Sequence, residues 1–424
     1  MKRIVLAFCI LIAAATSAGS QDFTGVLNGA PYKIRVPEKW NGVLLLHAHM
    51  YYLYPESYSL PEAAHGGVQA EDFLLSHGYA LAGSTFRGTG WQVKEGTEDL
   101  KALAKLFDGL VGKPKKRIVM GFSMGSLIAL KSAEEVLLYD GAIPMCSLAG
   151  SGPVDERDGG FAYAYDAVFG WPGDWGTWYD ARDGLSVLYD IGVYNHFLGQ
   201  LMDPSNIGKF EFIRLLFDLP LYGFYPLQPP EQYPAGQIST MFHLIFAVTD
   251  ARVEIEKRAG GFVYGNAGLN YELTPEEKGY LAGLGVNADQ LLYQMNSNAT
   301  ISPAKPQERY MEKYFEPTGD LLMPVLSVHS KIDHLYPAHF ETRLLDKVQS
   351  VDSEDLFLQV YTEEFGHCTF TPEQQLGAVV AMEHWLDKGR KPKSSYLKSL
   401  GFDPDYVPSA WPIGKKDEGP FWKK

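Results

Sequence analysis

Basic residues are scarce relative to acidic ones in this chain, which has 37 Lys and Arg against 51 Asp and Glu in 424 residues. The formal net charge is -14 at pH 7, and loss of the two positive charges of Lys2 and Arg3 takes it to -16. Phosphate backbones and anionic lipids repel such an acidic surface. We therefore expect no nucleic-acid partner and no binding to anionic membranes.

Long apolar runs are missing beyond the N-terminus. The apolar segment 4–15 follows two basic residues, precedes a group of small residues, and is too short to cross a bilayer comfortably. This pattern is typical of a secretory signal peptide over residues 1–20, with cleavage after Ala18 or Ser20. No later stretch is long enough to span, so we expect a soluble exported protein, secreted or periplasmic, without stable membrane insertion.

Cysteine is rare, with three residues in the chain. Cys9 would leave with the signal peptide, so Cys146 and Cys368 remain as an even pair in an oxidising compartment. Cys146 ends a predicted strand and Cys368 adjoins a histidine that follows another strand, so both should lie near the same sheet edge. A disulfide that holds the histidine loop and a pair of free thiols are both open alternatives.

What the chain does contain is an alternation of buried strands and helices. Four continuous apolar runs predict strands that are buried on both faces, and residues between them recur at helical spacing. A turn at Asn28-Gly29 predicts an antiparallel hairpin before them. The alternation predicts a mostly parallel central sheet flanked by helices, an α/β fold. The predicted strands are 43–46, 79–85, 118–122 and 141–148, and the predicted helices are 68–77, 97–107 and 124–138.

The alternation stops between residues 149 and 322. This segment is rich in Gly, Pro and aromatic residues, and it is too long and too apolar to be a loop. We expect it to fold as an inserted lid, or substrate subdomain, over the active site. The strand pattern resumes at 324–329 and 356–361, and a helix follows at 372–385. The predicted division is a core of 21–148 and 323–386, a lid of 149–322, and a tail of 387–424 that wraps the surface or is partly disordered.

The central motif is Gly-x-Ser-x-Gly at residues 121–125, between an apolar run and a helix-forming segment. A serine on a tight strand-to-helix turn needs glycines two positions before and after it, because larger side chains would collide with neighbouring backbone. Gly121 and Gly125 meet this need, so Ser123 is the predicted nucleophile. A serine hydroxyl reacts only when a neighbouring base takes its proton and a carboxylate orients that base.

Two residues late in the chain stand where that base and that carboxylate are needed. Asp333 and His367 each follow a predicted late strand, so loops at the sheet edge can bring them to Ser123. Asp320 is a weaker candidate because it precedes its strand. The other histidines of this region fit packing or solvent positions. They are His329, His334, His339 and His384.

With these residues in view, the chain resembles the α/β-hydrolases, in which nucleophile, acid and base follow in the order Ser, Asp, His. The resemblance implies a triad of Ser123, Asp333 and His367 that makes and hydrolyses an acyl-enzyme without a cofactor. The matching motifs are 121–125, the turn from His329 to Asp333 with Pro337, and Gly366-His367. The chain is also similar to exported bacterial serine hydrolases loosely grouped with the prolyl oligopeptidase superfamily, at 84–91, 314–319 with Pro324, and 366–368.

One departure from the family concerns the oxyanion hole. Many members carry His-Gly after the third strand, where this chain has His-Ala-His at 47–49. We expect the backbone N–H groups of Met124 and His49 to bind the oxyanion. Met50 or the Tyr51 hydroxyl could replace His49. The two histidines of the segment also suggest a metal site, but further ligands do not follow at close spacing, so no metal is predicted.

The lid contains a sharp aromatic cluster of Trp171, Trp175 and Trp178. The functional interpretation is a wall that binds an aromatic or acyl substrate. Packing in a small core of the lid itself is the alternative, and it is slightly favoured for any single one of the three.

Three hypotheses of function follow from these residues. The first is an exported carboxylic-ester hydrolase that acts on a small-molecule or oligomeric ester. The alternative is a serine peptidase or aminopeptidase of the prolyl oligopeptidase type, for which Glu276 and Glu277 are candidates to hold the substrate amine. The third, a non-enzymatic binding protein on the same fold, is disfavoured by the intact set of catalytic residue types.

Overall fold

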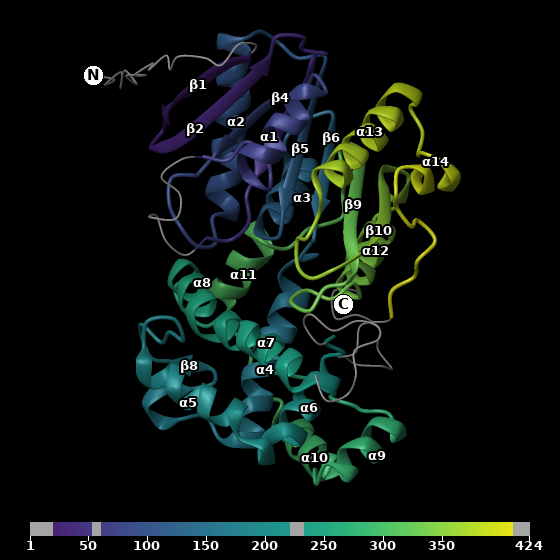
Figure 1. The fold of residues 1–424 in the computed structure, drawn as a ribbon. Coiled ribbons are helices and arrows are strands. Elements are labelled where there is room, and N and C mark those ends of the chain that lie inside the picture. The colour runs from purple at the N-terminus through teal and green to yellow at the C-terminus, as the bar shows by residue number, and fades with distance from the viewer. Residues whose placement is uncertain (1–19, 53–60, 221–232, 410–424) are drawn as a thin grey trace, which may run out of the picture.

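The computed structural model describes residues 20–52, 61–220 and 233–409 (Figure 1). The predicted signal peptide up to residue 19 and the last part of the predicted tail, 410–424, lie outside these described residues. Among the described residues, no helix combines the length and the apolarity that a membrane span requires.

Eight of the described strands form one sheet, in the order β1-β2-β4-β3-β5-β6-β9-β10. β1 pairs with β2 in an antiparallel hairpin at the predicted turn, and β2 is also antiparallel to β4. From β4 to β10 every neighbouring pair is parallel, which confirms the prediction of a mostly parallel sheet. The strands are β1 (Ser20–Leu27), β2 (Ala30–Pro37), β3 (Val43–Ala48), β4 (Ala80–Ser84), β5 (Lys116–Phe122), β6 (Gly141–Met145), β9 (Val325–Ile332) and β10 (Phe357–Phe365).

The central strands are apolar on both faces because helices cover both. All residues of β3 and β6 are buried, as expected of parallel strands between two helical layers. In such a sheet, ligands bind beyond the carboxyl ends of the strands. One face packs against α2 (Val93–Leu110), α3 (Met124–Glu135) and α12 (Phe340–Ser350), and the other against α1 (Gly67–Ser76) and α13 (Pro372–Lys388).

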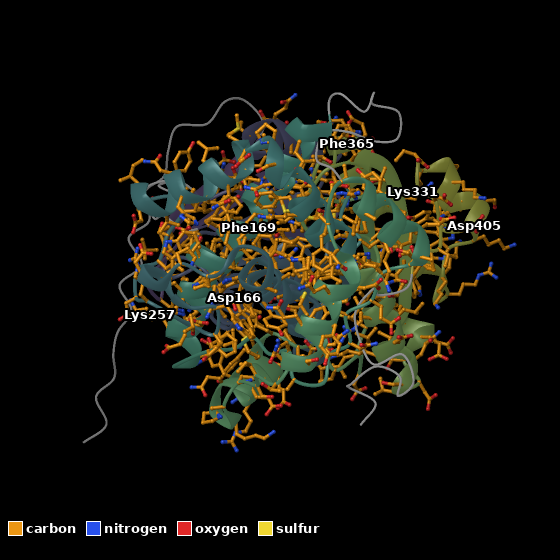
Figure 2. All side chains as sticks on the ribbon, turned by 90° about the horizontal axis from the view of Figure 1, so that it is seen from below. Asp166, Phe169, Lys257, Lys331, Phe365 and Asp405 are labelled. Atoms are coloured by element: carbon orange, nitrogen blue, oxygen red, sulfur yellow. A yellow bond between two sulfur atoms is a disulfide. The ribbon has the colours of Figure 1, made fainter. Side chains whose placement is uncertain are left out.

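The segment between β6 and β9 is mainly helical and lies beyond one end of the sheet, in the lower half of Figure 1. We call residues 151–314 the insertion. It has a hydrophobic core of its own, which includes Phe161, Phe197 and Leu244. Seen from below, its helices face the viewer, with Lys257 near one edge of the molecule (Figure 2). Its helices are α4 (Ser151–Phe169), α5 (Ile191–Met202), α6 (Ile207–Leu216), α7 (Tyr233–Phe246), α8 (Arg252–Ala259), α9 (Pro275–Gly283), α10 (Ala288–Asn298) and α11 (Lys305–Tyr314).

Polar contacts fix the insertion to the sheet and its covering helices. Glu156 on α4 and Arg343 on α12 form a buried ion pair with nitrogen–oxygen distances of 2.6 and 3.2 Å. At a second place, Glu254 on α8 accepts a hydrogen bond from the Trp91 backbone N–H at 2.7 Å. The Trp91 indole donates to the Ala251 carbonyl at 3.0 Å. These contacts dock the insertion on both α12 and the loop before α2.

The described part of the tail, residues 387–409, packs against the sheet near β10. It contains the short helix α14 (Ser394–Ser399). Leu397 and Phe402 are 1% and 2% exposed, and Asp403 pairs with Tyr361 of β10 in an isolated bridge. This part of the tail therefore covers the edge of the sheet at β10.

Candidate active site

Ser123 lies at the turn between β5 and α3, with backbone angles of φ 52° and ψ -117°. A positive φ is unusual for a residue other than glycine and persists only where the surrounding structure holds it. The Ser123 N–H donates to the Met145 carbonyl at 3.2 Å and lies 3.3 Å from Cys146 Sγ. The end of β6 therefore helps to hold the strained turn.

The two glycines of the motif are required because backbone atoms approach them closely. A Cβ at Gly121 would lie 1.8 Å from the Gly125 carbonyl oxygen. A Cβ at Gly125 would lie 2.1 Å from the Ala48 carbonyl oxygen. Neither distance leaves room for a carbon atom, so the turn excludes side chains at both positions.

Three of the predicted residues come together at this turn. His367 Nε2 is 2.8 Å from Ser123 Oγ, and His367 Nδ1 is 2.6 Å from Asp333 Oδ2. Asp333 follows β9 and His367 follows β10, so both loops leave the carboxyl edge of the sheet. Asp333 is fully buried, whereas Ser123 is 6% exposed and the His367 side chain 11%. The hydroxyl and the imidazole are thus the members that a ligand can reach.

The Asp333 carboxyl group is held in its ionised form. Its Oδ1 accepts hydrogen bonds from the backbone N–H groups of Leu335 at 2.8 Å and Tyr336 at 2.9 Å. Burial acts to raise its pKa, but the charge and hydrogen bond of His367 outweigh burial and hold the pKa well below the usual range. An ionised Asp333 favours the tautomer of His367 with its proton on Nδ1, which leaves Nε2 to accept the Ser123 proton.

Two contacts hold the loop that carries His367. Cys368 is bonded to Cys146 in a disulfide, with the two Cα atoms 5.3 Å apart. The Cys368 carbonyl also lies 2.9 Å from His65 Nε2. Of the two alternatives that the sequence leaves open for the cysteines, the structure has the disulfide. It joins the loop after β10 to the end of β6, next to Ser123.

Among the described residues, Cys146, His367 and Cys368 form the one group whose ligand atoms lie close enough together to hold a metal ion. Both sulfur atoms are joined to each other, and His367 directs its two nitrogens at Ser123 and Asp333. We therefore assign no metal to this group.

The predicted oxyanion donors lie close to the nucleophile. Met124 is the first residue of α3, where backbone N–H groups have no acceptor within the helix. The His49 main chain passes the same turn, since a Cβ at Gly125 would lie 2.8 Å from the His49 carbonyl oxygen. The His49 ring stacks on Phe86 with 4.2 Å between centroids, and burial lowers its pKa to about 4. The ring is therefore uncharged near neutral pH.

Tyr51, one of the predicted substitutes for His49, has a buried hydroxyl that makes no hydrogen bond with the described residues. Its ring packs on Trp91 and Phe246, with centroid distances of 4.9 and 6.1 Å. Burial raises the pKa of the hydroxyl, so it keeps its proton. A buried O–H without an acceptor is costly unless a ligand supplies one, which favours Tyr51 over Met50 as a donor.

The predicted tryptophan wall lies within the insertion's own core. Trp175 and Trp178 are 1% and 4% exposed, and Trp171 packs on Trp175 with 5.5 Å between centroids. Side chains enclosed in this way have little surface to offer a ligand, so their positions fit the packing interpretation. Glu277 is likewise used locally, in a capping box with Thr274 at the start of α9.

Several residues beside the triad are not predicted from the sequence. The Tyr336 ring lies 5.1 Å from the His367 ring, and the Arg157 guanidinium lies over the Tyr336 ring, 4.2 Å from its centroid. The rings of His334 and His243 meet at 4.7 Å. Arg157 and His243 belong to α4 and α7 of the insertion, so no local motif links them to the nucleophile. A charged residue within an aromatic-rich segment is the only signal that the sequence offers.

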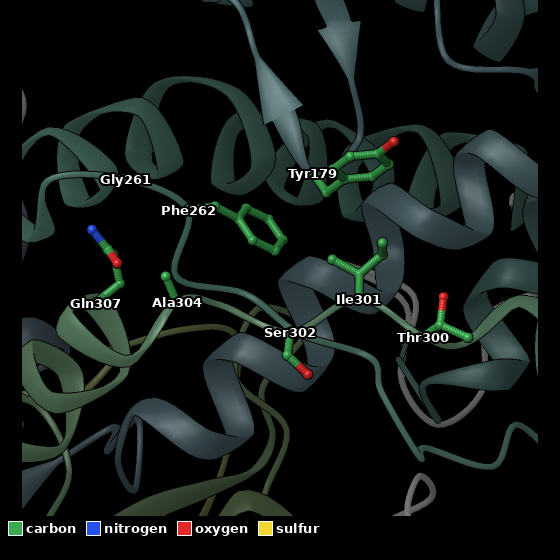
Figure 3. A pocket seen from close by; sticks show the side chains of 8 residues that line it. All are labelled: Tyr179, Gly261, Phe262, Thr300, Ile301, Ser302, Ala304 and Gln307. Atoms are coloured by element: carbon green, nitrogen blue, oxygen red, sulfur yellow. The ribbon is translucent and has the colours of Figure 1, made fainter.

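A separate pocket of about 500 Å³ lies on the insertion (Figure 3). An exposed tyrosine and a phenylalanine form part of its wall, and none of the residues hydrogen-bonded at the Ser123 turn lines it. It is therefore distinct from the candidate active site. Its lining residues are Tyr179, Gly261, Phe262, Thr300, Ile301, Ser302, Ala304 and Gln307.

No family model matches the chain. An o-phthalyl amidase from Xanthobacter agilis is 22% identical over an alignment of 426 positions, and the alignment covers 89% of this chain and 89% of that protein. Among solved structures, the rice cell wall degrading esterase LipA from Xanthomonas oryzae is 15% identical with a TM-score of 0.41, over 88% of this chain and 91% of that one. An acylaminoacyl peptidase is 11% identical with a TM-score of 0.41, over 90% of this chain and 43% of that one.

These similarities are distant, so the fold is assigned from the structure itself. An antiparallel start followed by parallel strands forms the sheet, and helices cover both of its faces. A strand, a strained serine turn and a helix follow one another at residues 116–135. The hydrogen-bonded Ser, Asp and His occur in that order along the chain. By these features, the protein has the α/β-hydrolase fold.

Proposed function

We propose that the protein is a serine hydrolase that cleaves carboxylic esters through an acyl-enzyme. The observation that carries this proposal is the series of hydrogen bonds at the Ser123 turn. Ser123 Oγ is 2.8 Å from His367 Nε2, and His367 Nδ1 is 2.6 Å from Asp333 Oδ2. These distances are within the range required of a nucleophile and its general base.

In the proposed reaction, His367 Nε2 takes the Ser123 proton while Oγ attacks the ester carbonyl. Asp333 stabilises the imidazolium that forms, without taking up the proton itself. His367 then protonates the leaving alcohol, and the acyl group stays on Ser123. A water molecule, deprotonated by His367, releases the acid. Proton transfer by a placed base of this kind typically contributes about 10²- to 10⁴-fold in rate.

The negative charge that develops on the carbonyl oxygen needs donors that are already in place. We assign the first to the Met124 N–H, at the positive end of the α3 dipole. The second is the His49 N–H or the Tyr51 hydroxyl, and the latter is supported because its buried proton has no acceptor among the described residues. Each donor of this kind is worth about 3 to 4 kcal/mol of transition-state stabilisation.

The insertion is proposed to select the substrate. Two of its side chains reach residues beside the triad: Arg157 contacts the Tyr336 ring, and His243 contacts the His334 ring. The disulfide between Cys146 and Cys368 supports export, since such bonds persist in oxidising compartments.

Amide hydrolysis is the second candidate, favoured by the similarity to an o-phthalyl amidase. The same triad can attack an amide carbonyl, provided that His367 protonates the poorer amine leaving group. The aminopeptidase version is less supported, because Glu277 of the proposed amine-binding pair caps α9.

A panel of p-nitrophenyl esters and aminoacyl p-nitroanilides tests these candidates. Ester turnover that is lost in Ser123→Ala supports the proposal, whereas anilide turnover promotes the amide candidate. The matched control is Ser132→Ala, a buried serine on α3 whose hydroxyl makes no hydrogen bond with the described residues. Full activity in Ser123→Ala would refute the nucleophile assignment.

A further inference from the structure

Arg157 is a buried cation beside the triad that the proposed reaction does not use. It lies on α4, is 1% exposed, and holds its guanidinium 4.2 Å from the centroid of the Tyr336 ring. The Tyr336 ring is in turn 5.1 Å from the ring of His367, and its backbone N–H donates to Asp333. A single aromatic ring is therefore in contact with both the guanidinium and the proposed base.

Among the described residues, the guanidinium has more donors than it has acceptors around it. Of its five N–H groups, Nε donates to Asp158 Oδ1 at 2.5 Å, and Nη2 contacts the same oxygen. The Tyr336 hydroxyl is a further partner. Neither terminal nitrogen has a well-aligned acceptor among the described residues. Unmet donors on a buried charge are costly, so the described residues leave this guanidinium able to take one more acceptor.

The histidines around Arg157 do not compete with it for an anion. Arg157 acts electrostatically on His243, His334 and His339. Burial is the main cause that lowers the pKa of each, to about 3 for His334, so all three rings are uncharged near neutral pH. Asp158, which is also buried, compensates the charge of Arg157 in the absence of a ligand. An incoming anion would thus meet one cation that is partly neutralised.

We propose that Arg157 binds a carboxylate on the acyl part of the substrate, so that the enzyme prefers half-esters of short dicarboxylic acids. The inference deepens the proposed function and depends on it for the bond that is cleaved. A carboxylate matches the planar edge of a guanidinium and forms charge-assisted hydrogen bonds with it. Because Arg157 and His367 both contact the Tyr336 ring, the second carboxylate must lie a few bonds from the scissile carbonyl, as in 2-carboxybenzoyl or succinyl groups.

A binding experiment tests the carboxylate site without catalysis. Calorimetry on Ser123→Ala protein compares phthalate with benzoate, which lacks the second carboxylate. We expect phthalate to bind at least about tenfold more tightly. The preference should vanish when Arg157→Met and Asp158→Asn are added together, a pair that leaves no unpaired charge. Equal affinities, or a preference that survives the double change, would overturn the inference.

A kinetic experiment connects the site to the reaction. We expect kcat/KM for monomethyl phthalate to exceed that for methyl benzoate by about tenfold or more, and this ratio to fall toward one in the Arg157→Met, Asp158→Asn variant. The matched control is Arg252→Met with Glu256→Gln, another arginine–carboxylate pair of the insertion, 2.6 Å apart, in which the arginine is buried. It should leave the ratio unchanged, because Arg252 packs on Phe262 rather than on Tyr336.

The outcomes separate the two claims. Hydrolysis of methyl benzoate with no preference for the half-ester overturns the carboxylate site and leaves the proposed function standing. Arg157-dependent binding of phthalate without hydrolysis of either ester supports the carboxylate site and refutes the proposed function.

Discussion

At the residue scale, the turn at Ser123 leaves no space beside its glycines. The atom that a Cβ at Gly125 would meet, 2.1 Å away, is the Ala48 carbonyl oxygen, which cannot rotate aside as a side chain would. We predict that Gly125→Ala lowers the free energy of unfolding by about 1 to 3 kcal/mol. It should also lower kcat by about 10²-fold, because Ser123 Oγ is moved relative to His367. Urea unfolding and ester hydrolysis measure the two effects.

Gly109→Ala is the matched control for this prediction. Gly109 is exposed on α2 and a Cβ there would have no neighbour within 4 Å. The change should raise stability by about 0.5 to 1 kcal/mol through helix propensity and leave kcat unaltered. A Gly125→Ala protein as stable and active as the wild type would contradict the proposal that the Ser123 turn has no room for a side chain at Gly125.

The sequence predicts some of these residues and not others for a physical reason. Ser123, Asp333 and His367 each follow an apolar run, and parallel strands carry their ends to one edge, so position in the chain indicates position in space. Their hydrogen bonds match the predicted set, while their catalytic roles stay predictions. Arg157 and Tyr336 meet only through the docking of the insertion, which no local pattern encodes.

At the element scale, a disulfide to a distant part of the chain holds the loop after β10 in place. The disulfide joins Cys368 to Cys146 across 222 residues of chain. We predict that replacing both cysteines by serine lowers the free energy of unfolding by about 5 kcal/mol, from the loop-closure model. It should lower kcat more than it raises KM, because the loop that positions His367 loosens while the substrate contacts remain. Urea unfolding and steady-state kinetics measure these changes.

Alkylation of the native protein provides the check on that prediction. Intact mass after iodoacetamide treatment should show no modification of Cys146 or Cys368 until a reductant is added. Two modified cysteines in the unreduced protein would contradict the disulfide, whatever the kinetics of the serine variant.

The helices of the insertion are harder to predict than the strands of the sheet. α4 contains Gly159 and Gly160, which disfavour a helix in isolation. In the fold, a Cβ at Gly159 would lie 2.7 Å from the Cβ of Tyr264, and one at Gly160 would lie 2.7 Å from the Phe217 ring. The glycines therefore admit aromatic neighbours, and tertiary packing overrides local propensity. For the same reason, an aromatic cluster in the sequence does not distinguish a core from a substrate wall.

At the scale of the whole molecule, buried histidines couple stability to pH. Burial is the main cause that lowers the pKa of six of them, and the unfolded chain takes up protons at these positions below about pH 6.5 while the folded chain does not. Stability should therefore fall as pH decreases from 6.5 toward 4. Each histidine contributes at most about 1.4 kcal/mol per pH unit. The six are His47, His49, His65, His243, His334 and His339.

Asp333 adds to the same trend at lower pH. Its pKa is lowered in the folded protein, so its stabilisation is complete above the unfolded value near 4 and is lost below it. Urea midpoints between pH 7 and pH 4 measure the slope that the histidines cause, and midpoints below pH 4 add the loss that Asp333 causes. His47→Leu should reduce that slope, because neither ring nitrogen of His47 is hydrogen-bonded to the described residues. The exposed His77→Gln is the control, and a slope that His47→Leu leaves unchanged would contradict this account.

The whole account depends on Ser123 as the nucleophile, activated by His367 at 2.8 Å. The most direct measurement is the intact mass of the protein after treatment with a fluorophosphonate, followed by peptide mapping. We predict one adduct, on Ser123, which is absent from Ser123→Ala and forms at least about 10²-fold more slowly in His367→Ala. An adduct on another residue, or none in a protein that hydrolyses esters, would contradict the central claim.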